Sequence, residues 1–125
     1  YYDSTAGVLK VLHCGNVTCN NGNVANTVDN SATVGWWSSI TTGADGFGLI
    51  SYTDNTNFKL RLIHCHDVAC SSGDTPITID AQGTSSIVVG ADGLPLVNYT
   101  GANGQALSMF HCTNPTCAPI TRVGR

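Results

Sequence analysis

The residues of this sequence best placed to do chemistry are three identical arrangements of histidine and cysteine. In each, a histidine is followed at once by two cysteines spaced C-x4-C. Disulfide formation is one interpretation and metal binding is the other. Zinc sites usually need four ligands, whereas each arrangement offers three, and an adjacent His and Cys on a strand point to opposite faces. We therefore predict no metal site and three local disulfides: Cys14–Cys19, Cys65–Cys70 and Cys112–Cys117.

Disulfides of this kind indicate where the protein is found. They form and persist in oxidising compartments, so we expect a secreted, extracellular or cell-surface protein. Closing such a short loop contributes on the order of 2 kcal/mol by the chain-entropy relation. The predicted bonds therefore stiffen loops and do not by themselves hold the fold together.

The other titratable residues do not form a catalytic pattern. The sequence contains eight Asp and no Glu, and it has no G-x-S-x-G, H-E-x-x-H or phosphate-binding loop motif. Asp45 and Asp92 lie in Asp-Gly turns, which backbone geometry alone explains. The carboxylates are too sparse for a calcium loop. We expect a protein that is not an enzyme and that carries no cofactor.

Aromatic residues offer a binding chemistry instead. Trp36, Trp37, Tyr52 and Tyr99 are candidate glycan contacts, because aromatic rings stack on sugars. The alternative is that the tyrosines fill a core, with their hydroxyls bonded to the backbone. Trp36 and Trp37 are adjacent on a predicted strand, so we expect one ring on each face.

Two sequons are candidate glycosylation sites that would make the chain a glycoprotein. They begin at Asn16 and Asn98, in Asn-Val-Thr and Asn-Tyr-Thr. A sequon of this kind is read by the glycosylation machinery when its asparagine is on the surface. The abundance of Ser and Thr would also allow O-linked glycans.

The histidine–cysteine arrangements belong to an internal repeat. In each copy a tyrosine lies twelve residues before the histidine. The periods are 51 residues from Tyr1 to Tyr52 and 47 from Tyr52 to Tyr99. Two copies also share the turn Gly-Ala-Asp-Gly, at residues 43–46 and 90–93. Self-similarity at such a period is typical of repeat architectures.

Composition and strand signals give the fold class. Thr, Gly, Asn and Ser occupy 50 of the 125 positions, and these residues favour strands and turns over helices. Each period contains short β-branched or apolar runs separated by turn signals. In the second copy these predicted strands are 36–41, 47–53, 58–64 and 77–80. We predict an all-β protein of antiparallel four-stranded repeats of about 47 residues, in other words β-propeller-type blades.

The blades divide the chain into one continuous repeat domain. We predict an incomplete first blade over 1–35, a second over 36–84 and a third over 85–125, whose last strand covers 120–123. Fewer than three blades cannot close a propeller, which needs about four to eight. We therefore expect an incomplete propeller or an open repeat stack. Either the chain belongs to a longer array, or neighbouring copies supply the missing strands.

One group of known proteins carries similar motifs. The run from ADGLPLVNY through the strand that ends in His-Cys to C-x4-C resembles tandem repeats of large secreted bacterial proteins. Those repeats have propeller-type blades with a DGLP turn-strand and an HC-x4-C loop. The resemblance covers nearly the whole chain and implies an extracellular β-repeat protein without a transferable activity.

These observations predict a non-enzymatic structural protein. Unclosed blades expose strand edges and apolar faces, which favours self-association into a surface fibre or adhesive assembly. The partner we expect is therefore the protein itself, as a homo-oligomer or filament. The formal charge of −3 gives no basic face for nucleic acid, and no apolar run is long enough to span a membrane. The alternative function is a glycan-binding, lectin-like module that contacts carbohydrate.

Overall fold

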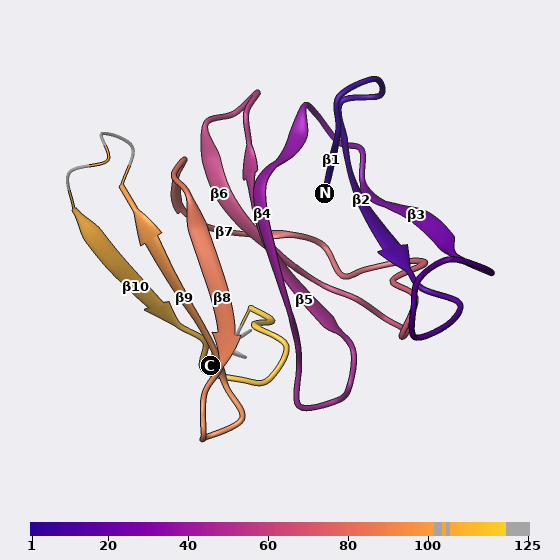
Figure 1. Ribbon diagram of the computed structural model, residues 1–125. Helices are drawn as coiled ribbons and strands as arrows, with labels where there is room; N and C mark the ends of the chain where they lie inside the picture. The colour runs from indigo at the N-terminus through magenta and orange to yellow at the C-terminus, as the bar shows by residue number, and fades with distance from the viewer. Residues whose placement is uncertain (102–103, 105, 120–125) are drawn as a thin grey trace, which may run out of the picture.

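The computed structural model describes residues 1–101, 104 and 106–119, and this part of the chain is all-β (Figure 1). Ten strands form three separate antiparallel sheets. The first sheet has the order β1 (Tyr2–Asp3), β2 (Val8–His13), β3 (Val24–Asp29). The central sheet has the order β4 (Val34–Thr42), β5 (Gly48–Asp54), β6 (Lys59–His64), β7 (Ile77–Ala81). The third sheet contains β8 (Ser85–Val89), β9 (Pro95–Thr100) and β10 (Leu107–His111).

The strands lie where the sequence predicts them. All four expected strands of the second repeat are present as β4 to β7, and each pairs with the next along the chain. In the first sheet, β1 is short and pairs only residues 2–3 with β2. The strand predicted over 120–123 lies outside the described residues. Within the described ranges, the model contains no helix long and apolar enough to cross a membrane.

The two Asp-Gly turns have the same construction. The Asp45 side chain accepts a hydrogen bond from the amide of Phe47, and the Asp92 side chain accepts one from the amide of Leu94. The glycine that follows each aspartate has a positive φ, 85° at Gly46 and 77° at the matching position. A side chain at such a position would be strained, which explains the Asp-Gly pair.

The sheets stack face to face, and each contact has its own hydrophobic core (Figure 1). The contact between the first and central sheets buries Leu9, Ile50, Tyr52, Ile63, Cys65 and Cys70. The contact between the central and third sheets buries Leu60, Val97, Tyr99, Cys112 and Cys117, with Phe110 packed against them. These are corresponding positions of the sequence repeat. The central sheet is therefore buried on both faces, and the outer two sheets on one.

A second pair of matching turns joins β1 to β2 and β5 to β6. In each, an aspartate side chain accepts hydrogen bonds from the amides two and three residues later. Each turn ends on a residue with positive φ, which is Gly7 (72°) in one and Phe58 (54°) in the other. Only glycine adopts this conformation without strain.

Replacing Phe58 with glycine should stabilise the protein. The Phe58 side chain is 62% exposed, so its loss removes little packing, while the relief of backbone strain is worth about 1 kcal/mol. The matched control is Gly7→Ala, which should destabilise the protein by a similar amount through backbone strain alone, since the added methyl group meets only the Thr33 hydroxyl at an ordinary contact distance of 3.8 Å. Urea unfolding of both variants measures the difference. A destabilising Phe58→Gly would show that its ring contributes more than its exposure suggests.

Candidate functional site

The predicted disulfides Cys14–Cys19, Cys65–Cys70 and Cys112–Cys117 are all present. Their Cα atoms are 4.7, 4.9 and 5.1 Å apart. The second cysteine of every pair has a positive φ, between 53° and 54°. All six thiols are therefore occupied, and the cysteines have no role as metal ligands.

Each disulfide loop is also held by one side chain whose role in the loop was not predicted from the sequence. The residue two positions after the first cysteine accepts a hydrogen bond from the backbone amide four residues further on. The pairs are Asn16 with Asn20, Asp67 with Ser71, and Asn114 with Ala118. Asn and Asp favour such turns because their short side chains bond to nearby amides. Their identical place in the three copies is the signal that could have identified them.

The two sequon asparagines are on the surface. Asn16 lies in the first disulfide loop, where its amide group also donates to the side chain of Asn20 at 2.7 Å. Asn98 lies in the middle of β9, with its side chain exposed on one face of the third sheet. A glycan on Asn98 would therefore project from a sheet face, whereas one on Asn16 would project from a loop.

The repeated tyrosines join one sheet to the next. The hydroxyl of Tyr52 on β5 donates to Asp29 on β3 at 2.6 Å. The hydroxyl of Tyr99 on β9 donates to Asp80 on β7 at 2.7 Å. Both tyrosines are buried, as in the alternative to glycan contact, but their hydroxyls bond to carboxylates and not to backbone groups. The two aspartates are 51 residues apart, so the repeat could have revealed them.

Electrostatics at the two contacts follow from burial. Burial and the neighbouring carboxylate raise the pKa of Tyr52 far above its usual value, so its hydroxyl stays protonated. Burial opposes ionisation of Asp29, but its hydrogen bonds from Tyr52 and Ser31 lower its pKa on balance. The hydroxyl of Tyr99 lowers the pKa of Asp80. Each contact therefore joins a neutral phenol to a carboxylate.

Replacing Tyr52 with phenylalanine should destabilise the protein by about 1–3 kcal/mol, since the buried Asp29 loses a donor. The matched variant Tyr99→Phe should cost less, because Asp80 is exposed and water can replace the hydroxyl. Chemical denaturation of the two variants compares them directly. Equal losses would indicate that solvent does not reach Asp80.

The aromatic residues form a surface cluster whose geometry differs from our prediction. We predicted the Trp36 and Trp37 rings on opposite faces of a strand, and this was wrong. Their centroids are 5.6 Å apart in an edge-to-face contact, and the ring of Tyr2 lies 5.5 Å from Trp36. The strand register shifts here and Trp37 has a φ of 48°, so a bulge turns its side chain. Among the candidate glycan contacts Trp37 is half exposed, whereas Tyr52 is fully buried.

His64 is the most constrained of the repeated histidines. Its Nδ1 lies 2.9 Å from Asp74 and its Nε2 lies 2.7 Å from Asp45. A carboxylate only accepts hydrogen bonds, so a doubly protonated ring satisfies both contacts. The nearby ring of His66 lowers the pKa of Asp74, and His64 adds to that effect. The pKa of Asp45 is lowered by the amide of Phe47 and by His64, against the effect of burial.

The same pairing recurs in the third sheet. His111 on β10 bonds to Asp92 through Nε2 at 2.9 Å, and this pair matches His64 and Asp45 in sequence position. His111 is exposed, as is His13 on β2, so of the three repeated histidines only His64 of the central sheet is buried. His66 lies just after β6 in a loop.

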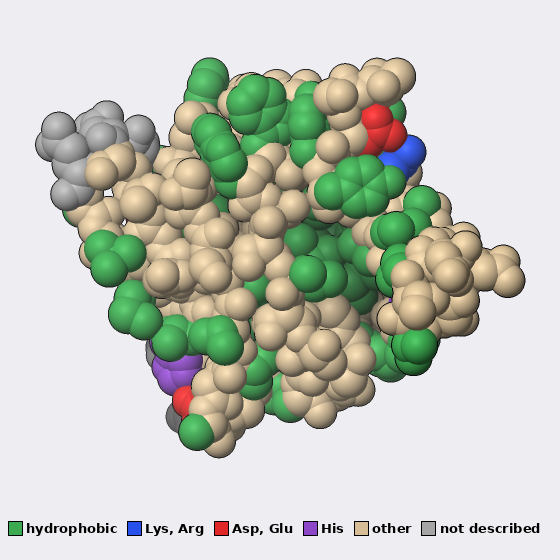
Figure 2. Space-filling view, in the orientation of Figure 1, with side chains coloured by type: hydrophobic (Ala, Val, Ile, Leu, Met, Phe, Trp, Pro, Cys, Tyr) green, Lys and Arg blue, Asp and Glu red, His purple; other side chains and the backbone are tan. Residues whose placement is uncertain are grey.

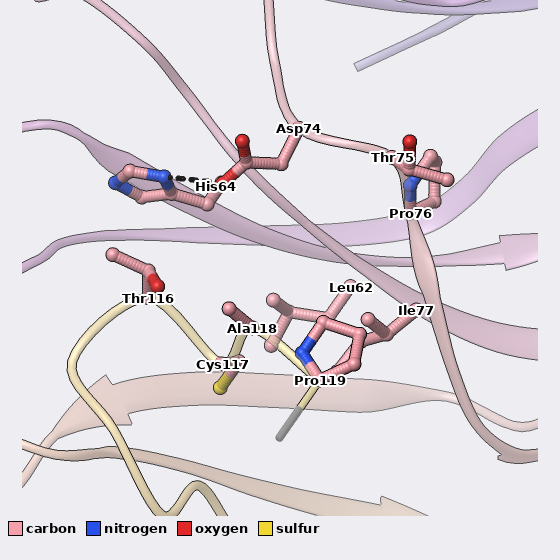
Figure 3. A pocket seen from close by; sticks show the side chains of 10 residues that line it. All are labelled: Leu62, His64, Asp74, Thr75, Pro76, Ile77, Thr116, Cys117, Ala118 and Pro119. Carbon is pink, nitrogen blue, oxygen red and sulfur yellow. Dashed lines mark hydrogen bonds and ion pairs between the residues drawn. The ribbon is translucent and has the colours of Figure 1, made fainter. Parts of the chain in front are cut away.

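A cavity of about 360 Å³ lies below His64, between the central sheet and the disulfide loop of the third sheet (Figure 3). Its walls are mainly apolar, with Leu62 and Ile77 on one side and Cys117 and Pro119 on the other. The polar lining residues are His64, Asp74, Thr75 and Thr116. None of the lining residues is a Phe, Tyr or Trp.

One difference between the repeats coincides with this cavity. In the contact between the first and central sheets, the Asn26 side chain donates to the carbonyl of Ala69 at 2.9 Å and so joins β3 to the disulfide loop. The corresponding residues in the next contact are Ile77 and Thr116. Isoleucine cannot donate such a bond, and Ile77 and Thr116 both line the cavity.

The outer faces of the first and third sheets carry exposed apolar side chains, which contrast with their buried equivalents. Leu107 and Met109 on β10 are 74% and 61% exposed, whereas Leu60 and Leu62 at the same repeat positions are 0% and 2% exposed. On the opposite end of the stack, Tyr1 and Leu12 are 52% and 47% exposed. Their equivalents are the buried Tyr52 and Ile63. We call these two surfaces the β10 face and the Tyr1 face.

The described residues do not suggest a metal centre. Within them, no three His, Cys, Asp or Glu side chains are grouped as a metal ion requires. The candidate functional surfaces are therefore the β10 face, the Tyr1 face and the aromatic cluster around Trp37. Comparison of the chain with protein-family models, with curated proteins and with solved structures gives no match.

Proposed function

We propose that this chain is a non-enzymatic extracellular structural module that associates with copies of itself through the two end faces of its sheet stack. In this proposal the three sheets are propeller-type blades of one repeat. The main support for the proposal is a difference in exposure between the third and second repeats. Leu107 and Met109 are exposed, whereas the residues at the same repeat positions, Leu60 and Leu62, are buried.

The two end faces are complementary because the internal contacts already pair such faces. The side of the central sheet that carries Leu60 and Leu62 packs on the side of the third sheet that carries Tyr99 and Phe110. The β10 face corresponds to the first of these sides and the Tyr1 face to the second. A head-to-tail contact between copies would repeat this packing. Heterologous contacts of this kind build filaments, or rings where the rotation closes.

Two further observations support an extracellular and non-catalytic role. The three disulfides suggest an oxidising environment. Both ring nitrogens of His64 are bonded to carboxylates, so this histidine has no free nitrogen to act as a base toward a substrate. The His–Asp and Tyr–Asp pairs recur between copies, as residues with a structural role do.

Glycan binding is the second candidate, and one observation favours it. The half-exposed ring of Trp37 lies beside a hollow of about 160 Å³ that is also lined by Gln82, Thr84 and Thr100. An aromatic ring next to amide and hydroxyl groups suits a sugar. Trp37→Ala should abolish glycan retention on an array if this candidate is correct, and it should leave assembly unchanged.

The proposal is tested by the self-association of the native chain. Sedimentation velocity and negative-stain electron microscopy should show filaments or rings, and the double variant Leu107→Asp, Met109→Asp should be monomeric. Val17→Asp is the matched control, because Val17 is also exposed but lies in the first disulfide loop. A wild-type chain that stays monomeric across concentrations, or assemblies that persist in the double variant, would contradict the proposal.

A further inference from the structure

A row of three side chains crosses the β10 face, with the sequon residue Asn98 at its centre. Ser86 of β8, Asn98 of β9 and Met109 of β10 are directly opposed across the third sheet, and all three are exposed. Opposed residues of neighbouring strands point to the same side of a sheet, so the whole row lies on the β10 face. Figure 2 shows hydrophobic side chains at the surface along the edge of the molecule that contains this sheet.

The central sheet contains the equivalent row, and there the row is covered. Ser39, Ser51 and Leu62 lie 47 positions earlier and are opposed in the same way. The amide of Ile87 donates to the Ser39 hydroxyl at 3.3 Å, and the hydroxyl of Ser85 donates to that of Ser51 at 2.9 Å. Leu62 belongs to the core between the central and third sheets. Every member of this row therefore contacts the third sheet.

The middle position of the row is fully enclosed in the central sheet. Ser51 is 0% exposed, and the third sheet lies within hydrogen-bonding distance of its hydroxyl. Asn98 has this position on the β10 face. A sugar on Asn98 would fill the space that a packed sheet needs, because stacked sheets lie only about 10 Å apart. A glycan on Asn98 and a sheet on the β10 face therefore exclude each other.

We propose that Asn98 carries an N-linked glycan and that this glycan prevents another sheet from packing on the β10 face. In the modification, the side-chain nitrogen of Asn98 forms a bond to C1 of a lipid-linked oligosaccharide. The bond from that carbon to the lipid diphosphate breaks, and the nitrogen loses one proton. The inference deepens the proposed function and rests on it, because the glycan decides which copies can associate through the β10 face.

The modification precedes folding. Asn98 lies on the middle strand of its sheet, where β9 pairs with β8 on one side and β10 on the other. Tyr99, the central residue of the sequon, is 8% exposed, and its hydroxyl is bonded to Asp80. The folded chain therefore does not present the sequon as a free segment. Each copy is modified or unmodified at Asn98 before it can meet another folded copy.

Glycan occupancy and association are measured on chains secreted by one line of glycosylating cells. Thr18→Ala removes the sequon that begins at Asn16, so that only the one at Asn98 remains. Peptide mass mapping should find the glycan on Asn98 of this variant, and sedimentation velocity should find the glycosylated form monomeric. The double variant Thr18→Ala, Asn98→Gln should associate at least about tenfold more tightly, because it lacks the steric block.

Two results of this experiment would overturn the inference. One is an unmodified Asn98 in cells that do modify Asn16 of the wild-type chain. The other is a chain glycosylated on Asn98 that associates as tightly as the variant with Asn98→Gln.

A matched variant tests the same exclusion inside the chain, where no association is needed. Ser51→Asn creates a second Asn-Tyr-Thr sequon at residues 51–53, beneath the third sheet. Its glycosylated form should stay unfolded in the cells or unfold at least about 5 °C below the same variant made with lipid-linked oligosaccharide synthesis inhibited, because the sugar displaces the third sheet. Equal thermal midpoints would overturn the inference. If Asn98→Gln stays monomeric while Ser51→Asn behaves as expected, the proposed self-association fails and the exclusion of a packed sheet by the glycan stands.

Discussion

Replacing Leu62 with alanine should lower the free energy of unfolding by about 2–5 kcal/mol, the range for a leucine truncated in a packed core. Leu62 is 2% exposed and belongs to the core between the central and third sheets. The same truncation at Met109 should change stability by no more than about 0.5 kcal/mol, the usual range at exposed positions. The two residues occupy the same position in the repeat. The comparison therefore measures the effect of burial, because a neighbouring sheet covers Leu62 but not Met109.

Urea unfolding at low protein concentration measures both variants as monomers. The proposed self-association gives this comparison a second test at high protein concentration. If the chain associates as proposed, Met109→Ala should then lose stability relative to the wild type, because burial of the β10 face would stabilise the folded chain. A large loss from Met109→Ala in the dilute monomer would contradict the exposure of this face.

The sequence predicted the features of this fold that depend on short stretches of chain. The strands of the central sheet, the Asp-Gly turns and the disulfide pairs each involve residues close in sequence, and local preferences decide them. Disulfides that join cysteines five residues apart leave little choice of partner. These features are confirmed by the structure.

Features that depend on which sheets are neighbours were harder to predict. His64 and His111 occupy the same repeat position, yet one is buried and the other exposed, because only the central sheet has a neighbour on each side. The bulge at Trp37 breaks the alternation on which our prediction of opposite faces rested. Neither effect can be derived from one period of the repeat alone.

The Tyr–Asp contacts lie between these extremes. Tyr52 was identified as a repeated residue, but its partner Asp29 was not, since the bond joins positions 23 residues apart in different sheets. Aspartates at 29 and 80 nonetheless follow the 51-residue period. A search for every pair of residues that recurs at the repeat period would have found these aspartates. The same search would have found a charged pair that joins β1 to β2 and β5 to β6.

That charged pair carries the second large prediction. Asp54 is completely buried, and its Oδ2 lies 2.8 Å from Nη2 of Arg61, whose side chain is 21% exposed. Replacing Arg61 with methionine should destabilise the protein by about 3–5 kcal/mol, because it leaves a buried carboxylate without its cation. Most of this loss reflects the cost of a buried, unpaired charge and not the strength of the ion pair.

The double variant Asp54→Asn, Arg61→Met separates the two effects. An asparagine side chain can still accept the hydrogen bonds that the backbone amides of Thr56 and Asn57 now donate to Asp54, but it carries no charge. We expect the double variant to be more stable than Arg61→Met alone, because it removes the unpaired charge, and the two substitutions should be non-additive by about 0.5–3 kcal/mol, the coupling typical of contacting residues. Denaturant unfolding of both single variants and of the double variant gives this coupling. Additive losses would contradict it.

The third repeat lacks both members of the equivalent charged pair. Where the first two copies have Asp3 with Lys10 and Asp54 with Arg61, the third has Gly101 and Ser108. Both partners are absent together. This is expected if a buried carboxylate without its cation costs more stability than the ion pair contributes. Lys10→Met is the matched single change in a more exposed setting. It should destabilise the protein less than Arg61→Met, because water can solvate Asp3 once the lysine is gone.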